Sequence, residues 1–238
     1  MPNESKHIVS SFEADLKKLH DMIAAMGGLV ERAVADAATA LLTHDANLAA
    51  NVIEHDAQIN AEQHAVEQFA VRLLALRQPV ADDLRQIIQA LKVVTDLERV
   101  GDYAANIAKR SIVINQVASN FSLSSLGQMA ALVQQNLKSS IDTVGEANPQ
   151  KAIALWRADQ AVDDLYNTIF RELITYMMED ARNITACTHL LFIAKNLERI
   201  GDHTTNIAEL VYYAVTGENL PDFRPKGDTT AAYLPSNG

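Results

Sequence analysis

The chain contains few of the residues that would cross-link it or interrupt a helix. Cys187 is its only cysteine, which excludes an intrachain disulfide and a zinc site built from cysteines. We expect Cys187 to be a small buried side chain. Glycine (9 residues), proline (6) and aromatic residues (5%) are scarce, whereas alanine and leucine are the commonest residues. This composition is typical of a helical protein and disfavours a β-sandwich or a β-barrel.

Basic residues are also in the minority, with 20 Lys and Arg against 30 Asp and Glu, so the net charge is -10. Such a charge repels phosphate backbones and disfavours nucleic-acid binding. The longest uncharged stretch, residues 111–137, is rich in Asn, Gln and Ser, so we do not expect it to span a membrane. Charged residues also interrupt any apolar run near the start, where no signal peptide is visible. We therefore expect a soluble, cytoplasmic protein.

What the sequence does contain is one motif in two copies. Residues 96–108 read D-L-E-R-V-G-D-Y-A-A-N-I-A, and residues 196–208 read N-L-E-R-I-G-D-H-T-T-N-I-A. Both copies follow the pattern L-E-R-[VI]-G-D-x-x-x-N-I-A. A match of this length at a fixed offset indicates a tandem duplication in which each half carries the same set of polar residues.

Apolar residues recur at helical spacing through most of the chain. Asp45 or Asn47 is expected to cap the second helix, Pro79 to follow its end, and Asn148 with Pro149 to start the fifth. Short connections indicate antiparallel neighbours. The predicted fold is all-α, with six long helices in two tandem three-helix bundles, at 1–118 and 119–216, followed by a loose tail at 217–238. The predicted helices span about 6–44, 47–77, 82–117, 123–146, 148–178 and 183–215.

The repeated motif has two faces. Leu97, Val100 and Ile107 follow the alternating steps of a seam that packs against neighbouring helices. Glu98 and Asp102 lie on a different face, one turn apart. Carboxylates at this spacing repel each other by a few tenths of a kcal/mol. A hard cation bound between them would reverse that cost, because such cations prefer oxygen ligands.

A second helix brings further carboxylates to each pair. Asp56 and Glu98 are equally far along the chain from the turn near Arg77, so an antiparallel hairpin places them at the same height. Asp159 and Glu198 have the same relation to the turn at 178–179. Asn60 takes the place of Asp163, which leaves less charge in the first half. The candidate metal ligands are Asp56, Asn60, Glu98, Asp102 and Asn106 in the first half, and Asp159, Asp163, Glu198, Asp202 and Asn206 in the second.

The same residues have other interpretations. Incidental acidic pairs on a solvated face would explain one copy, but two copies with matching second-helix aspartates favour a cation site. Gly101 and Gly201 each cost about 1 kcal/mol inside a helix, which indicates close helix packing. Arg99 and Arg199 can pair with neighbouring carboxylates.

The sequence has no P-loop, nucleophile elbow or repeated Glu-x-x-His pair, so we expect no catalytic residues. The alternative is a carboxylate-bridged metal enzyme, a hydrolase or an oxidase.

Four features together resemble the PhoU family over residues 6–216. They are the doubled motif, the corner R-Q-P-x-x-x-D-L-R at 77–85, the segment M-G-G-L-V-E at 26–31 and Y-M-M-E-D at 176–180. The resemblance implies two similar three-helix bundles and metal binding by E/D-x-x-x-D motifs, with iron or zinc in some members. By position these motifs are Glu98 with Asp102, Asp159 with Asp163, and Glu198 with Asp202; Asp56 with Asn60 departs from the pattern. The identity of the metal stays open among iron, zinc, manganese and magnesium.

The resemblance also implies a function. PhoU-like proteins link the ATPase subunit of the phosphate ABC transporter to a sensor histidine kinase, and they repress phosphate-starvation genes when phosphate is plentiful. The expected role is thus a non-catalytic adaptor and negative regulator that modulates phosphate uptake. We also expect a homodimer, with peripheral association at the membrane left open.

Overall fold

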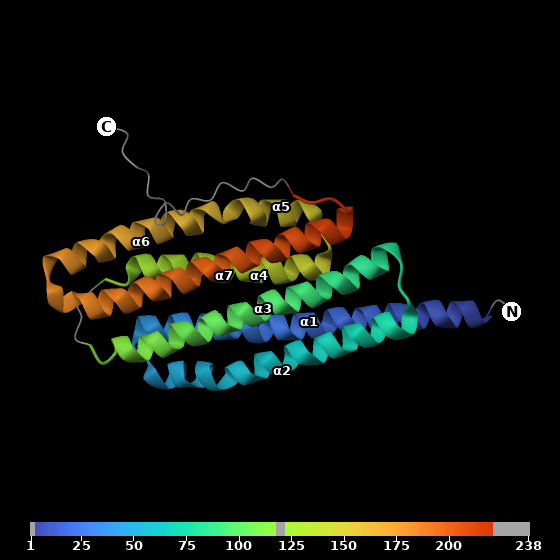
Figure 1. Cartoon of the computed structure of the whole chain (residues 1–238), viewed down its shortest axis with the longest axis horizontal. Helices are drawn as coiled ribbons and strands as arrows, with labels where there is room; N and C mark the ends of the chain where they lie inside the picture. Colours follow the sequence, from blue (N-terminus) through green and yellow to red (C-terminus); the bar gives the residue numbers. More distant parts are fainter. Residues whose placement is uncertain (1–2, 118–121, 221–238) are drawn as a thin grey trace.

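The computed structural model describes residues 3–117 and 122–220, with side chains from residue 12 onward. Helices make up nearly all of these ranges, and no strand occurs in them (Figure 1). The all-α prediction is confirmed. The elements are α1 (Asn3–Thr43), α2 (Ala46–Arg77), α3 (Ala81–Ile114), α4 (Ser124–Glu146), α5 (Pro149–Ala158), α6 (Gln160–Glu179), the short 3₁₀ turn η1 (Ala181–Asn183) and α7 (Ile184–Thr216).

The helix starts follow local capping chemistry. The Asp45 carboxylate accepts hydrogen bonds from the backbone N–H groups of Asn47 (2.9 Å) and Leu48 (3.0 Å), so Asp45 rather than Asn47 caps α2. Asn148 accepts from the N–H groups of the second and third residues of α5 in the same way. Pro149 occupies the first turn of that helix, where its missing N–H has no cost. Both sequence-based helix starts are therefore confirmed.

The fifth predicted helix is corrected by the structure, which divides it at Asp159 into α5 and α6. The Asp159 carbonyl accepts from the N–H groups of both Val162 (2.9 Å) and Asp163 (3.2 Å), which tightens the turn locally. The backbone of Asp159 stays right-handed, with φ -63° and ψ -28°. The interruption falls at a residue whose side chain is buried against α7, whereas the corresponding helix of the first half, α2, is continuous.

The predicted apolar seam forms the centre of the molecule. Leu97, Val100 and Ile107 of α3 are fully buried, as are Leu197 and Ile200 of α7. The most extensive contact between two helices joins α3 to α7, which lie side by side along the middle of the molecule (Figure 1). Helix α3 also packs against α1 and α2, and α7 against α4, α5 and α6. The two copies of the motif are therefore placed back to back at the interface between the halves.

A second contact between the halves joins α1 to α4. A Cβ added at Gly27 would lie 2.8 Å from the Cγ2 atom of Ile141, so this glycine permits the close approach. The boundary predicted between residues 118 and 119 lies outside the described residues, as does the tail prediction beyond residue 220. Cys187 is buried, as expected. Within the described parts of the chain, no helix combines the length and apolarity needed to cross a lipid bilayer.

Candidate functional site

The first acidic cluster lies between α2 and α3. It consists of Asp56 on α2 with Glu98 and Asp102 on α3, and the structure brings all three together. Burial, and next the nearby Asp102 charge, raise the pKa of Asp56. The same two causes raise the pKa of Glu98, and Asp56 adds to the effect. Each carboxylate is thus close enough to disfavour the ionised form of another.

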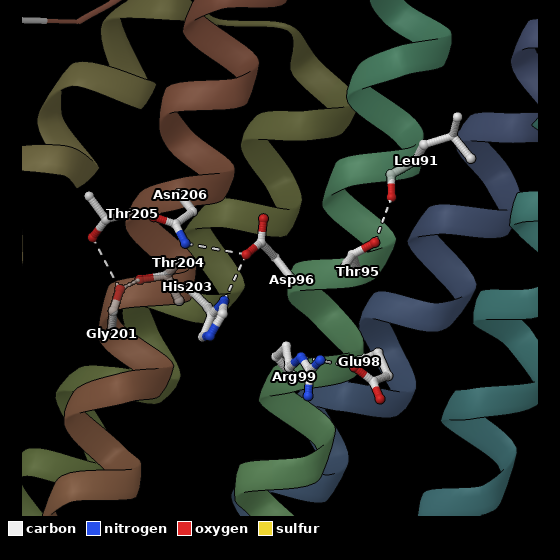
Figure 2. A network of polar contacts seen from close by, with 10 residues as sticks. All are labelled: Leu91, Thr95, Asp96, Glu98, Arg99, Gly201, His203, Thr204, Thr205 and Asn206. Carbon is white, nitrogen blue, oxygen red and sulfur yellow. Dashed lines mark hydrogen bonds and ion pairs between the residues drawn. The ribbon is translucent and has the colours of Figure 1, made fainter.

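A guanidinium group lies at the edge of this first cluster. Arg99 Nε is 3.6 Å from Glu98 Oε2, and its Nη1 is 3.7 Å from Asp102 Oδ2. The Arg99 side chain is 56% exposed, so these long contacts stabilise the fold only slightly. Thr95, one turn before Glu98, donates its hydroxyl to the Leu91 carbonyl at 3.0 Å and is occupied by its own helix (Figure 2).

The second acidic cluster is more deeply buried. Asp159 and Asp163, at the α5–α6 junction, are 2% and 3% exposed, and Glu198 on α7 is 6% exposed. Burial is the main cause that raises the pKa of Glu198; the charges of Asp202 and Asp163 add to it, and the Lys195 ammonium opposes it. Asp163, Glu198 and Asp202 therefore come together in this half, and the Asp159 side chain lies against Gly201 of α7.

Sequence reasoning missed one member of the second cluster, Lys195. Its Nζ donates to Glu198 Oε1 at 2.9 Å and lies 5.0 Å from the centre of the Tyr166 ring. Glu198 Oε2 is buried and has no hydrogen-bond partner among the described residues. A comparison of the two motif copies could have found this lysine, because the corresponding position in the first copy is Thr95.

The glycine that both motif copies share sets the distance between the helices of each half. A Cβ at Gly201 would lie 2.9 Å from Asp159 Oδ1 and 3.2 Å from Val162 Cγ1. At Gly101 the nearest atom would be Ile59 Cδ1, at 3.0 Å. Close packing at both glycines is confirmed, and at Gly201 the close neighbour is a carboxylate of the cluster itself.

The three asparagines in the candidate ligand set differ from the carboxylates. Asn60 is half-buried on α2, and Asn106 is exposed on α3. Asn206 is also exposed, and its amide donates to Asp96 Oδ1 at 3.3 Å (Figure 2). In this arrangement Asn206 faces α3 across the interface between the halves.

The same interface contains a polar network that sequence reasoning also missed. The Asp96 carboxylate lies 2.7 Å from His203 Nδ1, which links α3 to α7 (Figure 2). The rings of Tyr103 and His203 are 5.6 Å apart, and the Arg199 guanidinium lies 5.7 Å from the Tyr103 ring centre. The signal in the sequence is that the motif copies differ here, with Asp96 and Tyr103 in one and Asn196 and His203 in the other.

The donor chemistry of both clusters fits a hard cation. All the carboxylate ligands offer oxygen, which suits magnesium, calcium and manganese better than metals that prefer nitrogen or sulfur. The buried oxygen of Glu198 that lacks a hydrogen-bond partner also fits a cation. In the described ranges no three His, Cys, Asp or Glu side chains converge closely enough to hold a metal ion as they stand. Binding would thus require the carboxylates to rotate toward one another, and metal binding stays a prediction.

Comparison with known protein families shows to which family the chain is related. The family model for the PhoU domain matches residues 23–111 and again residues 126–211, once in each half. The chain belongs to the PhoU family. Both copies of the motif lie inside the two PhoU matches, so the resemblance drawn from the sequence is confirmed.

PhoU relatives match over nearly the whole chain. A phosphate-specific transport system accessory protein PhoU homolog from Caulobacter vibrioides is 47% identical over 225 residues, which is 94% of this chain and 98% of that protein. A homolog from Rhizobium meliloti is 45% identical over 94% of this chain and 95% of its own length. The crystal structure of PhoU from Pseudomonas aeruginosa superposes with a TM-score of 0.84 at 41% identity, covering 87% of this chain and all of that one.

Proposed function

We propose that this chain is a cytoplasmic accessory protein of phosphate uptake that represses the phosphate-starvation response when phosphate is plentiful. It acts as an adaptor between the ATPase subunit of a phosphate ABC transporter and a sensor histidine kinase. The support is the match to relatives named as accessory proteins of the phosphate-specific transport system, across 94% of this chain.

The observation that carries the metal-binding part of the proposal is the pair of acidic clusters at equivalent positions in the two halves. Each cluster joins the carboxylates of two helices, and burial together with mutual repulsion raises the pKa of Asp56, Glu98 and Glu198. A cation held by Glu98 and Asp102, or by Glu198 and Asp202, would neutralise this charge and hold the two helices together. We assign it a structural role in the adaptor.

The proposed adaptor does not catalyse a reaction. Its clusters supply cation ligands, while the motifs of nucleotide-binding and hydrolytic enzymes are missing from the sequence. The competing function is a carboxylate-bridged metal hydrolase or oxidase. Turnover of phosphoesters or activation of oxygen by the manganese-loaded or iron-loaded protein would favour that competitor.

Partner contacts are expected at the corner between α2 and α3. Leu76 and Val80 are two-thirds or more exposed there, and apolar side chains on a surface corner suit a protein interface. Phe192, half-exposed on α7, provides a comparison position away from this corner. We also propose that the adaptor is a homodimer.

Deletion of the gene in its bacterial host tests the proposal. Alkaline phosphatase activity should become high in phosphate-rich medium and should return to the repressed level when the wild-type gene is restored. The double substitution Leu76→Glu with Val80→Glu should fail to restore repression, whereas Phe192→Glu should restore it, since it adds one charge at an exposed site elsewhere. Continued repression in the deletion strain contradicts the regulatory role.

A further inference from the structure

A groove of about 900 Å³ lies over α3, and residues of α2, α3 and α7 line it. Helices α3 and α7 run side by side there (Figure 1). The apolar part of the lining consists of Ile88 and Leu91 on α3 and Leu210 and Tyr213 on α7. Ile88 and Tyr213 are 38% and 42% exposed, so this apolar surface is not covered by the described helices. A wide groove with exposed apolar side chains suits an extended segment of polypeptide.

The charged residues of the groove are mostly acidic. Among the described residues that line it, Glu67, Asp96 and Glu209 are acidic and Lys92 is basic. Asp96 and Glu209 each accept hydrogen bonds within the fold through one oxygen, Oδ1 and Oε1, and these bonds do not use the other oxygen (Figure 2 shows those of Asp96). The groove therefore favours an occupant that combines an apolar side chain with an excess of basic residues.

The chain that leaves α7 borders this groove. Gly217, with φ 75°, ends the helix and donates its N–H to the Tyr213 carbonyl at 2.8 Å. Arg85 Nε of α3 donates to the Ala214 carbonyl at 3.4 Å, which links the start of α3 to the end of α7. Asn219, two residues beyond Gly217, lines the groove itself. The described part of the chain thus leads the following residues to the groove.

The sequence that follows has the composition that the groove favours. Residues 221–226 read P-D-F-R-P-K. Phe223 supplies a large apolar side chain, and Arg224 and Lys226 outnumber the single acidic residue, Asp222. The two prolines favour an extended backbone before docking, which lowers the entropy lost when the segment is fixed.

The segment is also long enough to cross the groove. Along α7 the lining extends from Tyr213 back to Asn206, a rise of about 11 Å at 1.5 Å per residue. Six extended residues span up to about 20 Å. A segment that starts beside Asn219 and turns back along α7 can therefore place an aromatic side chain among the apolar residues and basic side chains near Glu209 and Asp96.

We propose that residues 221–226 dock in the groove over α3, with Phe223 against its apolar lining and Arg224 and Lys226 beside its acidic side chains. The docked segment covers apolar surface that the helices leave exposed and fastens the end of α7 to α3. It also restricts the access of other molecules to the side of the motif that carries Asp96. This inference depends neither on metal binding nor on the adaptor role.

Trypsin cleavage after Lys226 measures docking in the full-length protein. Lys226 is the last basic residue of the sequence, and the proline after Arg224 blocks cleavage there, so release of residues 227–238 reports this single event by mass spectrometry. Cleavage follows the fraction of molecules in which the segment is undocked. Phe223→Ser and Ile88→Glu should each raise the initial rate about tenfold. The control Val113→Glu, on the same helix with a similar exposure of 36%, should leave the rate unchanged.

Calorimetry with a synthetic peptide of residues 219–230 locates the binding surface. Full-length Phe223→Ser should bind the peptide, because its own segment no longer fills the groove. The wild type should bind at least about tenfold more weakly, since the peptide must displace the segment already docked. Phe223→Ser combined with Ile88→Glu should not bind, whereas Phe223→Ser combined with Val113→Glu should bind as Phe223→Ser does.

Three results would overturn the proposal. Cleavage rates in Phe223→Ser and Ile88→Glu equal to that of the wild type would show that the segment does not use the groove. Peptide binding that survives Ile88→Glu would place the site elsewhere. A wild-type cleavage rate that rises as the protein is diluted would show that the segment docks on a second copy of the chain, whereas docking within one chain gives a rate independent of concentration.

Discussion

At the scale of single residues, the two glycines of the motif are as important for the acidic clusters as the carboxylates themselves. Gly201 allows the Asp159 carboxylate to approach the backbone of α7, and Gly101 allows Ile59 and Asp56 to approach α3. The motif therefore contains its glycines because the helix that supplies further carboxylates must come close. The cost of about 1 kcal/mol for glycine inside each helix is offset by packing.

Substitution of each glycine by alanine should change the free energy of unfolding according to the atoms that the new Cβ contacts. Gly201→Ala places it 2.9 Å from Asp159 Oδ1 and should lower the free energy of unfolding by about 1–3 kcal/mol, as overpacking does. Gly101→Ala should cost less, because its nearest contact, Ile59 Cδ1, is longer at 3.0 Å and ends a longer side chain than the one contacted at Gly201. Gly145→Ala meets nothing within 4 Å and should stabilise α4 by up to about 1 kcal/mol. Urea unfolding followed by circular dichroism measures all three, and equal losses at Gly201 and Gly145 would contradict the packing argument.

Glu98 should make stability depend on pH in a defined direction. Its pKa is raised above the ordinary 4.5, first by burial and then by Asp102. Between the ordinary pKa and the higher pKa of the folded state, the folded chain therefore binds more protons than the unfolded chain. The free energy of unfolding therefore falls as pH rises through that window. In EDTA, Glu98→Gln should be more stable than the wild type at pH 7, and this advantage should vanish below the ordinary pKa. Urea titrations at a series of pH values test this, with Glu54→Gln, an exposed position on α2, as the control.

At the scale of helices, local signals determine most boundaries. Asp45 caps α2 with two hydrogen bonds, whereas α3 begins after Val80, which has no capping side chain. Asp45→Ala should lower the free energy of unfolding by about 1 kcal/mol, because two backbone N–H groups lose their acceptor. Asn47→Ala, at the other position that the sequence offers as a cap, should change it by less than about half of that. If the two substitutions cost the same in urea unfolding, Asp45 does not hold the start of α2.

Features that depend on local sequence could be predicted, whereas features that depend on how the two halves pack against each other could not. Helical periodicity gave the helices, and equal distances from a turn brought Asp56 to Glu98, because both follow from one hairpin. The interruption at Asp159 could not be predicted, since its backbone angles stay helical and only its hydrogen bonds change. Lys195 and the Asp96–His203 pair required a comparison of the two copies residue by residue, together with the α3–α7 interface.

At the scale of the whole molecule, the halves are joined by the two helices that carry the motif. The duplicated interface has diverged so that Asp96 meets His203, while the equivalent positions hold Asn196 and Tyr103. The largest helix contact in the described chain thus also has a hydrogen bond between a carboxylate and an imidazole across it. Because the buried seams of both halves meet there, unfolding of one half exposes apolar surface on the other.

This arrangement predicts that the halves unfold together. Trp156, the only tryptophan, bonds to Glu209 and reports the second half by fluorescence, whereas circular dichroism reports helices of both. The two urea transitions should coincide. Asp96→Ala, in the first half, should shift both midpoints equally through a loss of about 1–3 kcal/mol, because it removes a charge-assisted hydrogen bond to α7. His55→Ala, an exposed histidine whose Nδ1 contacts its own helix, should shift neither. A fluorescence midpoint that stays fixed in Asp96→Ala while the helix signal moves would show that the halves are independent, and the acidic clusters would then respond to cations separately.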